Sequence, residues 1–197
     1  MAYSEFANIL ERGVSEGYLP GREQDARNWF RTQATEIKRI NESGLYQSEI
    51  VRSRVFPGFM YLFMYMPKNR ITLPYYDALP LIFPFEVDST GFTGINFHYL
   101  DLPSRAKLMD YLYTLITNKD YDEKTRLRLT YATLKQVSKI PFYKACIKRY
   151  LYSQVRSRYI LIPANEWDIA LFLPLERFAK KSKTAVFSES KKIIARK

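Results

Sequence analysis

The fold of this chain is decided by the stretch Phe59-Met60-Tyr61-Leu62-Phe63-Met64-Tyr65, in which every residue is aromatic or apolar. Aromatic residues are typical of strands, and the turn-forming segment Pro67-Lys68-Asn69 follows closely. The stretch is also too short for a helix of ordinary length. We therefore predict a strand here, in a sheet-forming region that extends from Phe56 to about Leu102.

Two further strands are predicted toward the C-terminus. Leu79–Val87 is rich in apolar residues, and its two prolines favour an edge strand or a bulge, because proline cannot donate to a strand ladder. Gly91–Tyr99 is the third strand and contains Gly94. The loop at residues 73–77 carries tyrosines that we expect at the mouth of the sheet. The three strands indicate a small antiparallel sheet that could close into a barrel.

Helical periodicity flanks this region on both sides. Apolar residues recur at helical spacing over residues 6–14 and again over 26–40. In the second helix we expect the basic side chains, Arg27 and Arg31 among them, on the polar face. The apolar face needs a partner, which is either the chain's own core or a neighbouring subunit, and a polar tether at residues 41–49 would let the helix reach outward.

Beyond Pro103 the pattern predicts helices over residues 106–116, 121–137 and 141–155. Residues 159–163 read as an additional strand. Residues 166–174 form a buried apolar segment of undecided type. The order helices, sheet, helices is typical of the α+β class rather than of a doubly wound parallel sheet.

The 197 residues suit one domain with a core of its own. Within it we predict an N-terminal helical extension at 1–50, an α+β core domain at 51–176 and a basic C-terminal arm at 177–197. Arms of this composition commonly become ordered only on contact with a partner.

The chain is strongly basic. Lys and Arg number 31 against 20 acidic residues, a formal charge of +11. Such a field attracts nucleic acid, an anionic membrane surface or an acidic protein. The sequence opens without a basic leader and contains no apolar run of about eighteen residues, so we expect neither secretion by a signal peptide nor a membrane span.

Residues able to carry out catalysis are scarce. His98 and Cys146 are the only histidine and the only cysteine, so no zinc-site spacing exists, and His98 is expected to be a structural imidazole. No glycine-rich turn into a helix is present to hold phosphates. Asp77, Glu86 and Asp88 border the sheet and are the one carboxylate set that could serve a metal-dependent nuclease. We expect no catalytic residue, no metal and no cofactor.

Binding signals are stronger. Between residues 141 and 162 five basic residues alternate with tyrosines and no acid occurs. Cationic groups displace phosphate counterions and aromatic rings stack on bases, which favours a nucleic-acid surface. The alternative is that the tyrosines are core and the basic residues a solvated face. With three lysines of the arm, the candidate nucleic-acid-binding residues are Lys144, Lys148, Arg149, Arg156, Arg158, Lys180, Lys181 and Lys183.

The string Val-Arg-Ser-Arg occurs twice, at residues 51–54 and 155–158. Each copy precedes a predicted strand. Four residues repeated once are weak evidence, and coincidence is the better explanation.

Several segments together resemble a family of virion proteins from large contractile-tailed phages. The resemblance is carried by Ala26–Phe30, Met60–Lys68, Leu73–Leu81, Gly91–Leu100, Arg105–Asp110, Cys146–Leu151, Val155–Arg158 and Glu166–Pro174. The family is often labelled DNA end protector and elsewhere structural protein. The resemblance implies a component near the portal and neck that blocks exonucleases by occupying the genome terminus, and it supplies no catalytic residues.

The leading hypothesis is a non-enzymatic phage virion protein that binds the packaged genome terminus or the neck region. Its partners would be double-stranded DNA and other virion proteins, with several copies in a symmetric assembly, and it would be found in the virion and in the host cytoplasm during assembly. A structural adaptor of the neck, tail or baseplate without DNA contact is the alternative. A metal-dependent nuclease is the third possibility.

Overall fold

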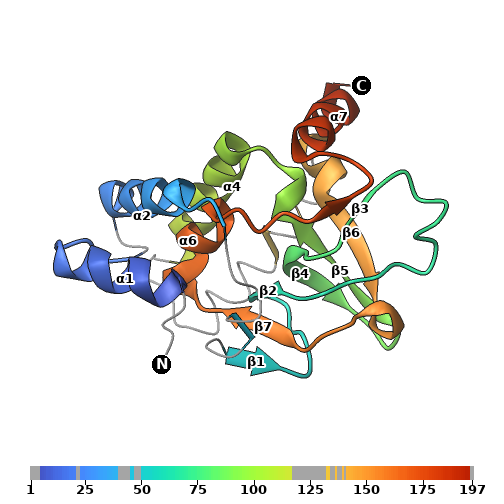
Figure 1. The fold of residues 1–197 in the computed structure, drawn as a ribbon, viewed down its shortest axis with the longest axis horizontal. Helices are drawn as coiled ribbons and strands as arrows, with labels where there is room; N and C mark the ends of the chain where they lie inside the picture. Colours follow the sequence, from blue (N-terminus) through green and yellow to red (C-terminus); the bar gives the residue numbers. More distant parts are fainter. Residues whose placement is uncertain are drawn as a thin grey trace.

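The computed structural model of the chain describes residues 5–20, 23–39, 45–46, 50–116, 132–133, 136, 139 and 141–195. These residues form a six-stranded antiparallel sheet in the order β1-β7-β2-β4-β5-β6, together with a two-stranded sheet of β3 and β8 (Figure 1). The strands are β1 (Ile50–Arg52), β2 (Met60–Leu62), β3 (Tyr76–Asp77), β4 (Leu81–Val87), β5 (Gly91–Asn96), β6 (Ile147–Leu151), β7 (Tyr159–Ile162) and β8 (Phe178–Ala179). The predicted α+β class is confirmed, and the larger sheet is open, with β1 and β6 as its edges.

The three strands expected around the aromatic stretch are all present. The strand of the aromatic stretch is shorter than the stretch itself, and every residue of β2 is buried. β4 lies between β2 and β5 and has a bulge between Pro84 and Glu86, so of the two alternatives, an edge strand or a bulge, the bulge is confirmed. Because Pro84 sits at this irregularity, a central strand can accommodate it.

Two glycines let β5 approach both of its neighbours closely. A Cβ atom at Gly94 would lie 2.5 Å from the carbonyl oxygen of Phe83 in β4. A Cβ atom at Gly91 would overlap the carbonyl oxygen of Tyr150 in β6. Glycine is therefore required at both positions for the observed spacing of the strands.

The helix predicted over residues 141–155 was wrong. The segment forms a 3-10 turn, η2 (Pro141–Cys146), then strand β6, then a second turn, η3 (Tyr152–Gln154). β6 pairs with β5 along its whole length, and its Tyr150 packs into an aromatic cluster with Phe63 and Phe92. Strand pairing and aromatic packing outweigh the local helical spacing. As a result, β6 and β7 lie in the sequence between α4 and α6, and the C-terminal half of the chain is not purely helical.

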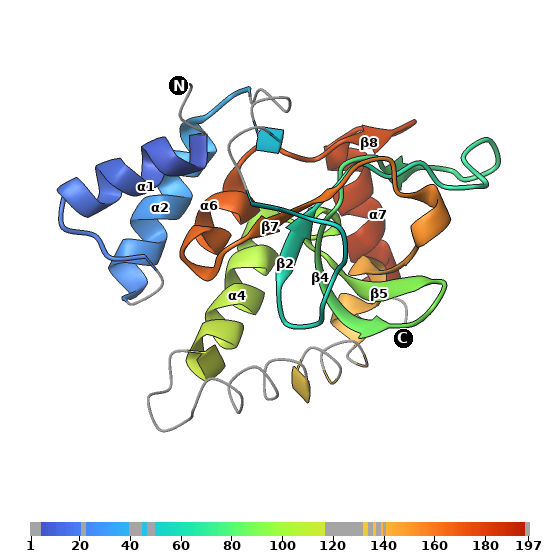
Figure 2. The same ribbon diagram turned by 90° about the horizontal axis from the view of Figure 1, so that it is seen from below.

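The described helices pack around this sheet. They are α1 (Glu5–Ser15), α2 (Gln24–Glu36), α4 (Leu102–Ile116), α6 (Trp167–Phe172) and α7 (Lys183–Ala195). Figures 1 and 2 show α1 and α2 at one end of the molecule, against α6, and α7 toward the other. None of the described helices is long and apolar enough to cross a membrane. The helix predicted at 121–137 lies outside the described residues except at 132–133 and 136, and the tether at 41–49 does so except at 45–46.

Arg31 departs from the expected polar face of its helix. Its guanidinium is buried, with Nε 2.7 Å from Oδ1 of Asp168 in α6 and Nη2 2.7 Å from Oδ1 of Asp110 in α4. The helical periodicity of α2 cannot reveal carboxylates that two other helices supply. The arginine therefore joins three helices in place of facing solvent.

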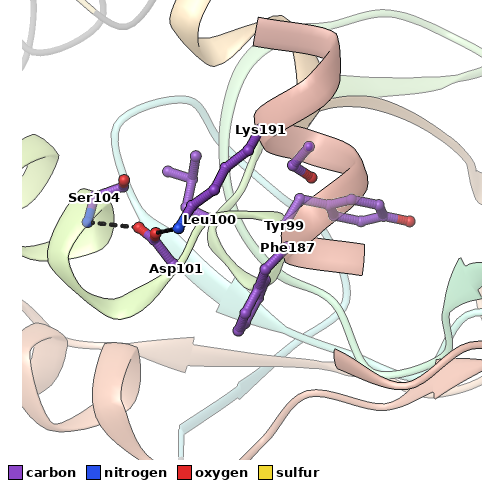
Figure 3. A pocket seen from close by; sticks show the side chains of 7 residues that line it. Tyr99, Leu100, Asp101, Ser104, Phe187 and Lys191 are labelled. Carbon is purple, nitrogen blue, oxygen red and sulfur yellow. Dashed lines mark hydrogen bonds and ion pairs between the residues drawn. The ribbon is translucent and has the colours of Figure 1, made fainter. Parts of the chain in front are cut away.

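The C-terminal segment is seated on the rest of the chain. β8 pairs with β3, and Val186 of α7 is fully buried. Figure 3 shows Lys191 reaching Asp101, with 2.8 Å between Nζ and Oδ2, while the backbone N–H of Ser104 donates to the same carboxylate. Residues 178–195 thus contain a strand and a helix, β8 and α7, that pack on the rest of the chain. The division into an extension at residues 1–50, a core domain at 51–176 and an arm at 177–197 stays a prediction.

Candidate nucleic-acid interface

The pairing of β1 with β7 brings the two Val-Arg-Ser-Arg strings to one place. Arg52 at the end of β1 is opposite Tyr159 at the start of β7. Residues of both strings, among them Arg54 and Ser157, line a single groove with a volume of about 730 Å³. Strings that are a hundred residues apart in the sequence therefore share one surface, which we call the arginine groove.

The two strings supply four exposed arginines, of which Arg54 lines the groove and the other three are sequence neighbours of lining residues. None of them forms an ion pair with a carboxylate of the described residues. They are Arg52, Arg54, Arg156 and Arg158. The last two were predicted; the first two were missed, although the repeat of the string was the signal that could have found them.

The tyrosines near this surface were predicted either to stack on nucleic acid or to belong to the core, and both cases occur. Tyr150 and Tyr159 are buried in the aromatic cluster, and burial raises the pKa of Tyr159 to about 12. Tyr152 is half-buried, with its ring centroid 5.7 Å from that of Phe92, and it lines the groove. Phe56 also lines the groove and is 57% exposed. Two tyrosines are thus core, while Tyr152 presents an accessible ring among the arginines.

Arg149 is the one predicted basic residue of β6 that has a carboxylate partner. Its Nη2 lies 2.8 Å from Oδ2 of Asp88 and 2.6 Å from Oγ1 of Thr90, in the turn between β4 and β5. The hydrogen bond from Arg149 holds the pKa of Asp88 well below its usual range, helped by the backbone N–H of Thr90. Asp88 is therefore a turn-stabilising acid.

A second concavity, the tyrosine recess, lies on the other side of this ion pair. It has a volume of about 380 Å³ and is lined by the loop after Pro67, by Tyr99 and by residues of β6. Lys148 is half-buried there, with Nζ 4.1 Å from the ring centroid of Tyr99, and burial lowers the pKa of its ammonium. Five tyrosines line the recess: Tyr65, Tyr75, Tyr76, Tyr99 and Tyr150.

A buried hydrogen-bond network forms the back of the tyrosine recess. Oδ2 of Asp77 accepts from Nδ2 of Asn96 at 2.9 Å and lies 2.8 Å from Nδ1 of His98. Its Oδ1 accepts from the backbone N–H of Leu79, and Nδ2 of Asn96 also donates to the hydroxyl of Tyr150. His98 is structural, as predicted. Both carboxylate oxygens of Asp77 accept hydrogen bonds, and the bond from Asn96 connects β3 to the sheet.

This arrangement bears on the nuclease hypothesis. Asp77 is buried and hydrogen-bonded, Asp88 is paired with Arg149, and Glu86 is exposed near the end of β4. In the part of the chain that the structure describes, no three His, Cys, Asp or Glu residues are placed to hold a metal ion. The three carboxylates have separate structural positions and do not form one site there.

Two lysines of the predicted C-terminal set bind the loop beside the recess. Lys180 has a φ of 69° and donates from Nζ to the carbonyl oxygens of Ile71 at 2.7 Å and Leu73 at 2.9 Å. Lys181 pairs with Glu189 and lies with Nζ 4.5 Å from the ring centroid of Tyr75. Both lysines therefore hold the loop in place.

Lys144 and Lys183 complete the predicted set. Both are exposed, Lys144 in η2 and Lys183 at the start of α7. Neither lines the arginine groove or the tyrosine recess. The structure thus distributes the eight predicted residues over several surfaces instead of one.

A comparison with known protein families supports a link to phage DNA. The family model described as phage T4 terminal DNA protecting protein matches residues 8–197. Searches of curated proteins and of solved structures give no match. The family match covers both the arginine groove and the tyrosine recess.

Proposed function

The chain belongs to the phage T4 terminal DNA protecting protein family, and from this premise we propose that it binds the end of a phage genome and shields it by occupancy, without catalysis. The observation that supports the proposal is the set of four exposed arginines of the two strings, which lack a carboxylate partner among the described residues. Arg54 lines the arginine groove, and the other three lie next in sequence to residues that line it. Buried or paired arginines contribute little to an external field, whereas these four are available to phosphates.

The affinity in this proposal is electrostatic. Each guanidinium that neutralises a phosphate releases a condensed counterion, so binding weakens with salt by about 0.9 in logarithmic slope for each contact on duplex DNA. Backbone contacts carry no sequence information. Binding through the groove is therefore independent of sequence, which suits a protein that must cover a terminus whatever bases it holds.

The test is a salt titration of binding to linear duplex DNA. Replacing the four groove arginines by alanine should reduce the logarithmic slope by about 3 to 4. The matched control replaces four exposed cations elsewhere, Lys38, Arg39, Lys107 and Lys192, and should change the slope by less than about 1. Equal slopes for the two variants would contradict the proposal, and so would undiminished protection of linear DNA from an exonuclease by the groove variant.

A structural adaptor is the second candidate, and it is favoured by an apolar surface on the segment between residues 56 and 71. Phe56 and Ile71 are 57% and 84% exposed, and Phe59 and Met64 are also exposed. Apolar side chains on a surface mark contacts with other proteins. In this proposal the chain contacts neck, tail or baseplate subunits in several copies, within the virion and, during assembly, in the host cytoplasm.

The two candidates separate in particles assembled from variant protein. Phe59→Ser with Ile71→Ser should lower incorporation into virions and leave DNA affinity unchanged, because neither residue lines the arginine groove or the tyrosine recess. If incorporation is unaffected by these two changes, the apolar segment is not the assembly surface.

A further inference from the structure

The tyrosine recess has a use that the arginine groove does not explain. The two concavities share no lining residue, and the ion pair of Arg149 with Asp88 connects them, because Arg149 lines the recess and Asp88 lines the groove. With a volume of about 380 Å³, the recess lies at the small end of the range for small-molecule sites. It is large enough for a group of the size of one nucleotide and too small for a duplex.

The walls of the recess suit a flat aromatic group. Tyr65 packs on Tyr150 with ring centroids 4.8 Å apart, and Tyr75 packs on Tyr99 with ring centroids 6.0 Å apart. Tyr76 lines the recess from β3. Tyr75 and Tyr76 are both half-buried, so their rings present accessible surface to the cavity. Base stacking on tyrosine is tolerant of sequence, because every base has a π-face.

The charge of the recess suits an anion. The half-buried Lys148 has no carboxylate within ion-pair distance among the described residues, and Lys68 stands exposed on the rim. The only acid in the lining is Asp77, whose oxygens face the buried network with Asn96 and His98. Burial lowers the pKa of Lys148 because its ammonium has lost water, and a phosphate at this position would replace that solvation.

We propose that the tyrosine recess takes one unpaired nucleotide at the terminus of the DNA, with its base stacked against Tyr76 and its phosphate beside Lys148. This inference rests on the proposed function, which supplies the DNA, and it adds the element that distinguishes an end from the body of a duplex. The arginine groove binds backbone anywhere along the molecule. Only an end presents a nucleotide that enters the recess without the cost of unpairing internal bases.

The test compares DNA with and without ends. The ligands are a closed duplex minicircle and linear duplexes of the same length that are blunt or carry one unpaired nucleotide at the 5′ or the 3′ side. The wild-type protein should bind one overhang type roughly 5- to 100-fold more tightly than the minicircle. The preferred overhang gives the strand polarity, and an abasic residue at that position should remove most of the preference.

Four variants of the full chain assign the effect. Tyr76→Ala and Lys148→Met should abolish the preference for the overhang and leave binding to the minicircle unchanged. Tyr76→Phe keeps the ring and should keep the preference. Arg156→Ala with Arg158→Ala should weaken binding to all ligands by a similar factor. Thermal unfolding of each variant confirms that it is folded.

The outcomes separate this inference from the proposed function. If the wild-type protein binds the minicircle and every linear duplex equally, the recess proposal is overturned while DNA binding by the groove stands. If Tyr76→Ala retains the full preference for the overhang, the end is recognised elsewhere and the recess proposal is likewise overturned. If the wild-type protein binds none of the ligands, both proposals are lost.

Discussion

Two groups of arginines in this molecule have opposite surroundings. Among the helices, Arg31 and Arg105 are buried, and each meets at least one carboxylate. At the β1–β7 edge of the sheet, four arginines are exposed and have no carboxylate partner among the described residues. The chain's excess of positive charge is therefore not a uniform property: part of it is neutralised inside the fold, and part faces outward at one edge.

The contrast follows from the cost of burial. A guanidinium removed from water must recover its solvation from carboxylates and carbonyls, so a buried arginine is bound to its partners. An exposed arginine has no such cost, and its charge remains available to a polyanion. Substitutions in the two groups should thus affect different measurements: stability for the buried group and DNA binding for the exposed group.

The largest expected effect is at Arg105. Its side chain is fully buried, with Nη2 2.6 Å from Oε1 of Glu176, and it donates to the carbonyl oxygens of Leu100 and Leu171 at 2.9 and 2.7 Å. Arg105→Met leaves Glu176 and these carbonyls without their donor, and should reduce the free energy of unfolding by about 3–5 kcal/mol. Urea denaturation measures the loss. If the free energy of unfolding fell by less than about 1 kcal/mol, the buried ion pair would be dispensable, and the contrast between the buried and the exposed arginines would not hold.

Lowering the pH should have a smaller effect on the stability of the fold. Burial, the largest single cause, acts to raise the pKa of Glu176, but the charge of Arg105 and the other favourable interactions of the carboxylate together outweigh it, and the net pKa is lowered from the usual 4.5. A carboxyl whose pKa is lower in the folded state stabilises the fold above its unfolded pKa and loses that contribution as pH falls through the folded value. Stability should therefore decline below about pH 4.5.

The variant Glu176→Gln isolates this contribution. Its free energy of unfolding should vary less with pH in that acidic window than the wild-type value does. The control is Glu36→Gln, because Glu36 is exposed at the end of α2. An acid dependence unchanged by Glu176→Gln would assign the transition to other carboxyls.

Much of the sheet was predictable because its strands carry local signals. The aromatic stretch gave β2, the apolar run with prolines gave β4, and the glycine-containing run gave β5. β6 carries a misleading signal: Tyr143, Ile147 and Leu151 recur at the spacing of four residues that a helix would show. The strand forms because β5, and Phe63 and Phe92 of the aromatic cluster, are supplied by segments more than fifty residues away.

The candidate site was only partly predictable for a related reason. The sequence locates each charge but does not show which partner it meets. Lys180 and Lys181 were predicted to face nucleic acid, yet they hold the loop beside the recess. Arg52 and Arg54 were missed because the sequence does not show that the first string lies beside the second. Only the pairing of β1 with β7 brings the two strings together.

The smallest expected effect is on stability at the arginine groove. Because Arg52, Arg54, Arg156 and Arg158 are exposed, replacing all four by alanine should change the free energy of unfolding by no more than about 1 kcal/mol, and separation of these like charges could even stabilise the fold. The same variant is expected to lose DNA binding, so a small change in urea denaturation alongside a large change in salt slope would sharpen the contrast. A loss of several kcal/mol would show instead that the groove arginines hold the β1–β7 edge together, and that their exposure is a by-product of a structural role.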